Sequence, residues 1–186
     1  ERERAQECDL LLVSNRERLE GSRARGERAW LVPNGVDFNF FSAGQSRGRL
    51  AHISKPVVGY SGPLAPWLDY DLLYQVVESR PQYSFVLIGS LGQEEELHRH
   101  KISRLTQLPN LYALGHRPHA EIPSYLADFD VCILPFVLNQ VTHAAEPFML
   151  YEYLSQGKPV VTTALRELSR YTNLILVASG AGDFAQ

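Results

Sequence analysis

Short glycine-containing segments follow three of the apolar runs in this chain of 186 residues. These segments are Ser61-Gly62-Pro63, Gly89-Ser90 and Gly115-His116-Arg117. Glycine lets a backbone approach a ligand closely, and the N-terminus of a following helix offers unpaired N–H groups to a phosphate. Turns between strands and helices also favour glycine for structural reasons alone. Three such segments in succession nevertheless indicate a phosphate-binding edge.

The densest group of candidate residues lies in the 143–161 segment. Glu146 stands just before a predicted helix, so its carboxylate is expected to cap that helix. Glu152 falls within the same helix among apolar and aromatic neighbours, where a carboxylate must reach solvent or accept a hydrogen bond from a hydroxyl. The nearby aromatic side chains, Phe136 and Phe148 among them, suit either stacking on a base or sugar or a place in the core.

Eight short apolar runs must position these residues, and they alternate with amphipathic segments of helical length. This pattern is typical of a parallel α/β sheet with helices on both faces. Because ligands bind beyond the carboxyl ends of the strands in such sheets, the glycine segments are expected to meet at one edge. The predicted strands are Leu10–Val13, Trp30–Val32, Val57–Tyr60, Phe85–Ile88, Leu111–Leu114, Val131–Leu134, Val160–Thr162 and Leu174–Val177. The predicted helices are Leu68–Glu78, Glu94–Leu108, Pro118–Ala127 and Phe148–Ser155.

The composition is that of an ordinary globular protein, with 45% hydrophobic and 21% charged residues and a formal net charge of −3. Nucleic acids and anionic membranes attract positively charged proteins, so nucleic acid is not expected as a partner. The two cysteines fit a reducing compartment. No apolar run approaches the ~18 residues of a membrane-spanning helix, and the first residues lack the apolar stretch of a secretory signal. A cytoplasmic location is therefore expected.

Other kinds of site lack their key residues. His98 and His100 form one histidine pair and His116 and His119 another, but a metal site needs further ligands, so no metal is expected. The sequence contains no Gly-x-Ser-x-Gly elbow, Walker loop or Gly-x-Gly-x-x-Gly fingerprint.

A domain boundary is expected at the turn segment 33–37, Pro-Asn-Gly-Val-Asp, which precedes an irregular stretch reaching Gly48. We therefore divide the chain into residues 1–33, a connection from a missing N-terminal domain, residues 34–55, a linker, and residues 56–186, an α/β domain. The chain does not begin with Met, which indicates a piece of a longer protein.

Six segments, in order along almost the whole chain, carry a family resemblance. They are Pro33-Asn34-Gly35-Val36-Asp37, Gly59-Tyr60-Ser61-Gly62 with Trp67 and Asp69, Val86-Leu87-Ile88-Gly89, Leu114-Gly115-His116-Arg117, Asp130-Val131-Cys132-Ile133-Leu134-Pro135-Phe136, and Glu152-Tyr153-Leu154-Ser155-Gln156-Gly157-Lys158-Pro159-Val160-Val161. The chain resembles the C-terminal, nucleotide-sugar-binding half of a group 1 glycosyltransferase of the GT-B fold. Trp67 and Asp69 are most similar to the branch that includes teichuronic acid and capsular polysaccharide enzymes.

The resemblance implies a Rossmann-like open parallel sheet that binds a nucleotide-sugar donor. It further implies a hexosyltransferase-like enzyme that transfers the sugar with retained anomeric configuration to a saccharide acceptor, which the missing N-terminal domain would hold. The nucleotide sugar is then a substrate, and no cofactor is expected. The active site of this fold lies between two domains, so the fragment alone is expected to be inactive. The full-length protein could also attach peripherally to the inner face of the membrane.

The resemblance also implies roles for individual residues, but no catalytic residue. Gly62 would lie against the donor diphosphate, and Glu152 would bind the ribose hydroxyls. The remaining candidates are Ser90, His116 and Arg117 in the nucleobase slot, the backbone amides of Phe148, Met149 and Leu150 at the phosphates, and Phe136 and Glu146 nearby.

This chain departs from the family pattern in its cations. Residues 61–80 contain no lysine, and Met149 stands where this branch commonly has one. The family's first glutamate would fall at Ala144, two residues before Glu146. The candidate cations at the ligand-binding edge are Arg117 and Arg166, whereas Lys158 precedes its strand and is excluded. These departures support an alternative, a non-catalytic α/β binding module with a degenerate nucleotide-sugar site.

Overall fold

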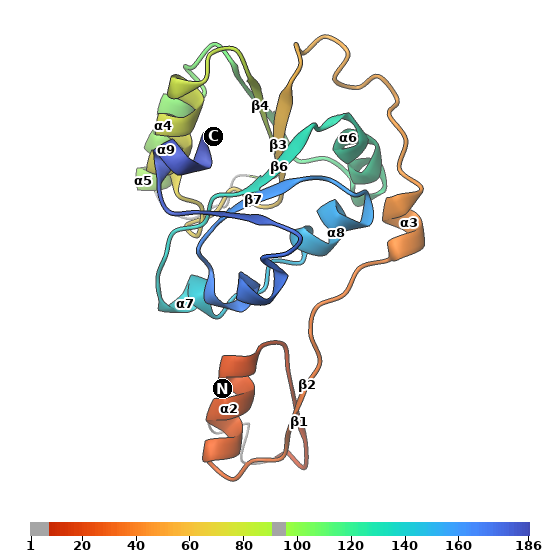
Figure 1. Ribbon diagram of the computed structural model, residues 1–186, viewed down its shortest axis with the longest axis vertical. Helices are drawn as coiled ribbons and strands as arrows, with labels where there is room; N and C mark the ends of the chain where they lie inside the picture. Colours follow the sequence, from red (N-terminus) through yellow and green to blue (C-terminus); the bar gives the residue numbers. More distant parts are fainter. Residues whose placement is uncertain (1–7, 91–95) are drawn as a thin grey trace.

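The computed structural model describes residues 8–90 and 96–186, and it places them in two separate parallel sheets. The first sheet pairs β1 (Leu11–Val13) with β2 (Ala29–Leu31), and helix α2 (Arg16–Ala24) connects the two strands. We call these three elements the N-terminal unit. Figure 1 shows this unit set apart from the larger sheet and joined to it by one segment that contains helix α3 (Phe38–Ser42).

The larger sheet has six parallel strands in the order β5-β4-β3-β6-β7-β8. This order and the parallel pairing confirm the predicted Rossmann-like α/β fold. The strands are β3 (Val57–Ser61), β4 (Ser84–Ile88), β5 (Leu111–Gly115), β6 (Val131–Leu134), β7 (Val160–Thr163) and β8 (Leu176–Ala178). The chain reverses its direction of travel across the sheet between β3 and β6, which creates a topological switch point.

Helices cover both faces of this sheet (Figure 1). One face carries α4 (Tyr70–Ser79), α5 (Glu96–Leu105) and α9 (Ala181–Phe184). The other face carries α3, α6 (Ile122–Asp128) and α8 (Met149–Ser155). The short helix α7 (Gln140–His143) and the 3-10 helices η1 (His119–Glu121) and η2 (Arg166–Tyr171) lie in the connections after strands.

The sequence pattern accounts for helix α4 directly. The Asp69 side chain accepts a hydrogen bond from the amide of Leu72 at 2.9 Å and so caps the first turn. Leu72, Leu73 and Val76 are buried at helical spacing against the sheet. The central strands β3 and β4 are buried along their whole length, which explains their largely apolar sequences.

All eight predicted strands are present, and their ends differ from the prediction by at most two residues. The prediction of an irregular conformation after residue 37 is wrong for Phe38–Ser42, because these residues form helix α3. Asp37 caps this helix, and Phe41 enters the core, but five residues are too few to display a helical period. The predicted helix Glu94–Leu108 is observed as Glu96–Leu105, and its first predicted residues lie outside the described chain.

Candidate functional site

The three glycine segments lie side by side at the carboxyl edge of the sheet. The amide of Gly62 donates to the carbonyl of Ile88 at 2.8 Å, and the amide of Gly89 donates to the carbonyl of Gly115 at 3.0 Å. The amide of Leu64 donates to the carbonyl of Ser90, also at 3.0 Å. The ends of β3, β4 and β5 are therefore joined to one another by backbone hydrogen bonds.

Glycine is required at position 89 because of this close approach. A Cβ atom on Gly89 would lie 1.8 Å from the carbonyl oxygen of Gly62, so one of the two backbones would have to move. At Gly62 the nearest obstacle is the methyl end of Met149, 2.4 Å from a Cβ atom built there. Met149 therefore packs directly over the first glycine segment.

These segments form one wall of a pocket of about 240 Å³, which we call the edge pocket. Six of the predicted residues line it: Gly62, Ser90, His116, Arg117, Phe148 and Glu152. The other lining residues are Ser61, Pro63, Ile88, Gly89, His119 and Ile122. Loops from the carboxyl ends of three strands thus converge with helices α6 and α8 on a single cavity, as expected for a ligand site of this fold.

Helix α8 holds Glu152 in the edge pocket. The hydroxyl of Tyr153 accepts from the amide of Ser61 at 2.8 Å and donates to its carbonyl at 3.2 Å, which fixes α8 against the end of β3. Gln156, at the other end of α8, donates to the carbonyls of Phe41 and Pro123. The helix position therefore depends on contacts with β3, α3 and α6.

Glu152 is only 7% exposed, and burial raises the pKa of its carboxyl to about 7. The Nε2 atom of His119 lies 4.0 Å from a carboxylate oxygen of Glu152. The imidazole of His119 stacks on the ring of Phe40, with 5.4 Å between ring centroids, and meets the ring of Phe41 edge-on. The two phenylalanines of α3 thus orient the imidazole of His119 beside the buried carboxyl group of Glu152.

Among the described residues that line this pocket, Arg117 is the permanent cation. Its Nε atom donates to the hydroxyl of Tyr125 at 3.0 Å, and one terminal nitrogen donates to the carbonyl of His116 at 3.2 Å. A guanidinium has five N–H donors, so these two bonds orient it while leaving others for a ligand. The pocket therefore combines one buried carboxylate with one arginine and two histidines.

Three further predicted residues lie beside this pocket. Phe136 and Met149 line an adjacent cavity of about 270 Å³ with Phe148, which contributes to both; we call it the apolar hollow. Its other lining residues are Pro63, Trp67, Val141, Thr142, Ala145 and Pro147. Leu150 is fully buried, and its amide already donates to the carbonyl of Pro147 at 3.1 Å. Its backbone therefore does not offer a free donor to a phosphate.

The prediction that Glu146 caps the helix is wrong. The N-cap of α8 is Phe148, and it has no side-chain hydrogen bond. The carboxylate of Glu146 instead pairs with Arg170 and accepts from the hydroxyls of Tyr151 and Tyr171. Glu146 does not line the edge pocket. Nothing in the local sequence indicates a partner 24 residues farther along the chain.

The other two cations considered from the sequence, Arg166 and Lys158, do not line the edge pocket. The side chain of Arg166 is 71% exposed, and its guanidinium lies 3.8 Å from the carboxylate of Glu17 on α2. Lys158 donates to the carbonyls of Ala127 and Phe129, which precede β6, so it lies at the opposite edge as predicted.

His119 lines the edge pocket but is not among the predicted ligand contacts. It follows the end of β5 by four residues, whereas the predicted segment after this strand ends at Arg117. The signal for His119 is its place at the start of η1, the first helix after the strand.

Two general features complete the description of the chain. Among the residues whose side chains the structure describes, which exclude that of His98, no three potential metal ligands come together. None of the described helices combines the length and the hydrophobicity needed to cross a membrane.

Comparison with known proteins places the chain in a family. The profile described as Glycosyl transferases group 1 matches residues 55–186. A relative from Bacillus subtilis (strain 168), whose provisional name is teichuronic acid biosynthesis glycosyltransferase TuaH, is 29% identical over 147 residues. That alignment covers 77% of this chain and 36% of the relative.

Solved structures share the fold. Alr3699/HepE from Anabaena, in complex with UDP and glucose, matches 96% of this chain and 52% of its own, with a TM-score of 0.68 and 20% identity. Sucrose-phosphate synthase from Thermosynechococcus elongatus matches 96% of this chain and 47% of its own, with a TM-score of 0.73 and 20% identity. The C-terminal domain of LpcC, a group 1 family protein from Francisella tularensis, matches 81% of this chain and 84% of its own, with a TM-score of 0.57 and 16% identity.

The chain spans 36% of its curated relative and about half of the first two solved chains, at 52% and 47%. At these identities the solved structures show the fold alone, whereas the profile match extends over most of the chain. The teichuronic acid relative also agrees with the branch that the sequence resembles. The chain therefore belongs to the group 1 glycosyltransferase family.

Proposed function

We propose that this chain is the donor-binding part of a retaining glycosyltransferase and that the edge pocket receives the nucleotide of a nucleotide sugar. The observation that carries the proposal is the placement of Glu152, a buried carboxylate, opposite glycine segments with basic groups at their ends. A carboxylate accepts well from the two hydroxyls of a ribose. Backbones without side chains allow the diphosphate to approach closely.

Sugar transfer would require positive charge in this pocket, beside the departing diphosphate. Transfer of the sugar breaks the bond between its anomeric carbon and the diphosphate, so negative charge grows on the departing phosphate oxygen. Arg117 is a permanent cation at this pocket, and His116 and His119 can add charge when protonated. A saccharide acceptor, and the groups that hold it, would belong to the rest of a longer protein.

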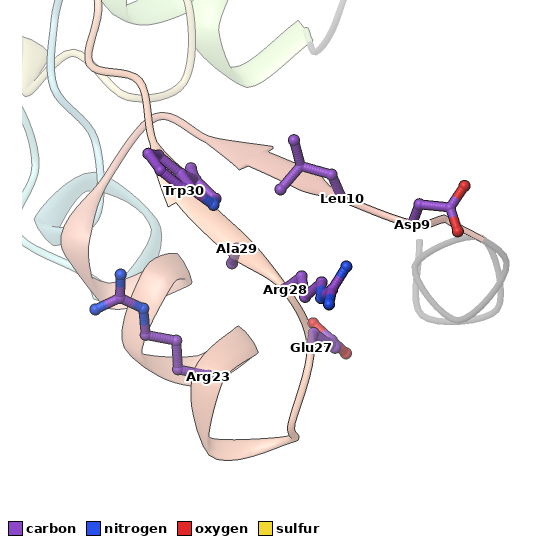
Figure 2. A pocket seen from close by; sticks show the side chains of 7 residues that line it. All are labelled: Asp9, Leu10, Arg23, Glu27, Arg28, Ala29 and Trp30. Atoms are coloured by element: carbon purple, nitrogen blue, oxygen red, sulfur yellow. The ribbon is translucent and has the colours of Figure 1, made fainter.

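The N-terminal unit supports the proposal of a longer protein. Leu12 and Trp30 are paired in register, and their side chains are 66% and 68% exposed on the face of the small sheet that α2 does not cover. Figure 2 shows Leu10 and Trp30 beside a hollow of about 550 Å³ at this sheet. Parallel sheets are covered on both faces in α/β proteins. We therefore propose that residues 1–33 belong to a second domain, with residues 34–55 as the linker.

Calorimetric titration of the chain with UDP, GDP and ADP tests the nucleotide site. UDP is included because HepE is described in complex with UDP. We expect saturable binding of one nucleotide, weakened on the order of tenfold by Arg117→Ala and by Glu152→Gln, since each change removes a charged hydrogen-bonding group. Arg104→Ala is the matched control, because Arg104 stacks on Tyr74 on a helical face away from the edge pocket. Absence of binding by all three nucleotides would contradict the proposal.

Met149 favours one alternative function, a binding module with a degenerate site. Met149 is 3% exposed and its methyl group covers Gly62, where a diphosphate would otherwise approach. If the site is degenerate, Met149→Lys should raise nucleotide affinity about tenfold, because it returns a cation to the phosphates. If Arg117 already supplies the charge, affinity should stay the same. Met149→Leu, measured in the same titration, controls for the change in packing.

A further inference from the structure

The most deeply buried charged cluster of the described chain lies outside the edge pocket. The side chain of Glu146 is 1% exposed, and one of its oxygens accepts from Arg170, Tyr151 and Tyr171, the last at 2.9 Å. The hydroxyls of the two tyrosines are 2.8 Å apart. A buried ion pair is costly to form, and well-packed apolar residues stabilise a fold equally well. The pair is therefore weak evidence for stabilisation of the fold, and its position relative to the two cavities is the informative feature.

The position of Glu146 in the chain suggests a role for this residue. It lies at the centre of the 144–148 loop, two residues before Phe148. Ala145 and Pro147, its direct neighbours, line the apolar hollow, and Phe148 lines both that hollow and the edge pocket. Any bond that fixes Glu146 therefore fixes the shared wall of the two cavities.

A second bond holds the same residue from the other side. The side-chain amide of Asn34 donates to the backbone carbonyl of Glu146 at 2.7 Å. Asn34 lies between β2 and α3, in the single segment that joins the N-terminal unit to the larger sheet. The carboxylate and the carbonyl of one residue are thus held by η2 and by the connecting segment, respectively.

The N-terminal unit also reaches η2 directly. The guanidinium of Arg166, on η2, lies 3.8 Å from Glu17 of α2. Arg170, four residues farther along η2, lines a hollow of about 400 Å³ together with residues of α2. The N-terminal unit is therefore linked to Glu146 in two ways: through Asn34 in the connecting segment, and through the contact between α2 and η2.

From these contacts we infer that Glu146 is a positioning residue. Its carboxylate, held by Arg170, and its carbonyl, held by Asn34, fix the 144–148 loop and so place Phe148 in the wall of the edge pocket. The position of the N-terminal unit is thereby coupled to the shape of that pocket. The inference rests on the proposed nucleotide site only in its effect on affinity, because the position of the loop can be measured without a ligand.

Trp67 provides that measurement, because it lines the apolar hollow with Phe148. The chain has two tryptophans, so Trp30→Phe leaves Trp67 as the single tryptophan, whose fluorescence can be excited apart from that of tyrosine. In this background, Glu146→Gln, Arg170→Met and Asn34→Ala should each raise the acrylamide quenching constant of Trp67 about twofold as the wall loosens. Arg170→Lys keeps the positive charge beside the Glu146 carboxylate and should recover most of the original value.

Two controls are matched to the test variants. Glu78 also accepts from a tyrosine hydroxyl, that of Tyr74 at 3.0 Å, so Glu78→Gln repeats the chemical change on a distant helix. Asn39→Ala repeats the loss of an exposed asparagine side chain on α3. Neither control should change the quenching constant, and circular dichroism melts should verify that each variant is folded.

Affinity for UDP, GDP and ADP is the second readout. Where the parent chain binds a nucleotide, Glu146→Gln and Asn34→Ala should weaken it about tenfold and the controls should not. Where the parent chain binds none, the proposed function fails, and the quenching of Trp67 still decides the positioning role. Unchanged quenching in folded Glu146→Gln and Asn34→Ala would overturn the inference. If Glu146→Gln does not fold, Asn34→Ala alone decides, because it removes one bond of an exposed side chain.

Discussion

Glu152 is a single carboxylate whose surroundings decide its charge near neutral pH. Its ordinary pKa of 4.5 is raised to about 7 by burial at the edge pocket. Two hydroxyl donors from a ribose would favour the ionised form and lower this pKa again. Burial of the Glu152 carboxylate costs stability, and hydrogen bonds from a bound diol would offset part of that cost.

The raised pKa predicts a pH dependence of folding. Between about pH 4.5 and pH 7 the folded chain keeps a proton on Glu152 that the unfolded chain has lost. The free energy of unfolding therefore decreases as the pH rises through this window, by roughly 2 kcal/mol after discounting for solvent screening. Glu152→Gln should remove this decrease, as measured by urea unfolding at pH 5 and pH 8. An equal decrease in both proteins would show that Glu152 does not titrate in this range.

At the scale of elements, the carboxyl ends of β3, β4 and β5 depend on contacts between backbones. The carbonyl of Gly62 occupies the space that any side chain at position 89 would need. The bonds from Gly62 to Ile88 and from Gly89 to Gly115 require the same spacing of strands. Loss of one glycine should therefore disturb all three segments together.

Gly89→Ala tests this dependence. A methyl group 1.8 Å from the carbonyl oxygen of Gly62 cannot be accommodated by a rotamer change, so the backbones must separate. We expect a loss of about 2 kcal/mol or more in the free energy of unfolding, together with loss of any nucleotide binding. Gly35→Ala is the control, because no heavy atom lies within 4 Å of a Cβ atom built at that glycine. Similar unfolding curves for the two variants would contradict the expectation.

The sequence predicts the strands and their glycine segments well, but it does not predict the charged cluster around Glu146. The strands and their glycine segments are visible because apolar runs and turn residues are local properties of the chain. The six lining residues that were predicted all follow a strand or lie on a predicted helix. The prediction of a helix cap at Glu146 is wrong because the partners of its carboxylate include Arg170 and Tyr171, which come from η2 after β7. Tertiary packing alone brings them together, and no local pattern encodes that contact.

At the scale of the whole molecule, the N-terminal unit exposes a row of large apolar side chains. Leu10, Leu12, Trp30 and Val32 are all exposed on two adjacent chain segments. Exposed apolar patches of this kind mark interaction surfaces or cause association. By itself, the chain should therefore self-associate at high concentration through this sheet.

Replacing Leu12 and Trp30 together by lysine should prevent that association. The two side chains lie outside the hydrophobic core, so the thermal unfolding of the larger sheet should stay the same. Sedimentation velocity at increasing protein concentration measures the effect. Leu138→Lys, at an exposed residue of the β6–α7 connection and outside the small sheet, should leave association unchanged. Equal association of all three proteins would place the contact elsewhere.

The separation of the two sheets has a consequence for local opening. The small sheet shares no strand with the larger one, and one of its two faces has no cover among the described residues. Backbone amides of β1 and β2 should therefore exchange their hydrogens with solvent deuterium by opening as a small group, at a lower free energy than those of β3 and β4. The chain would then unfold in two steps, with the N-terminal unit opening while the six-stranded sheet stays closed.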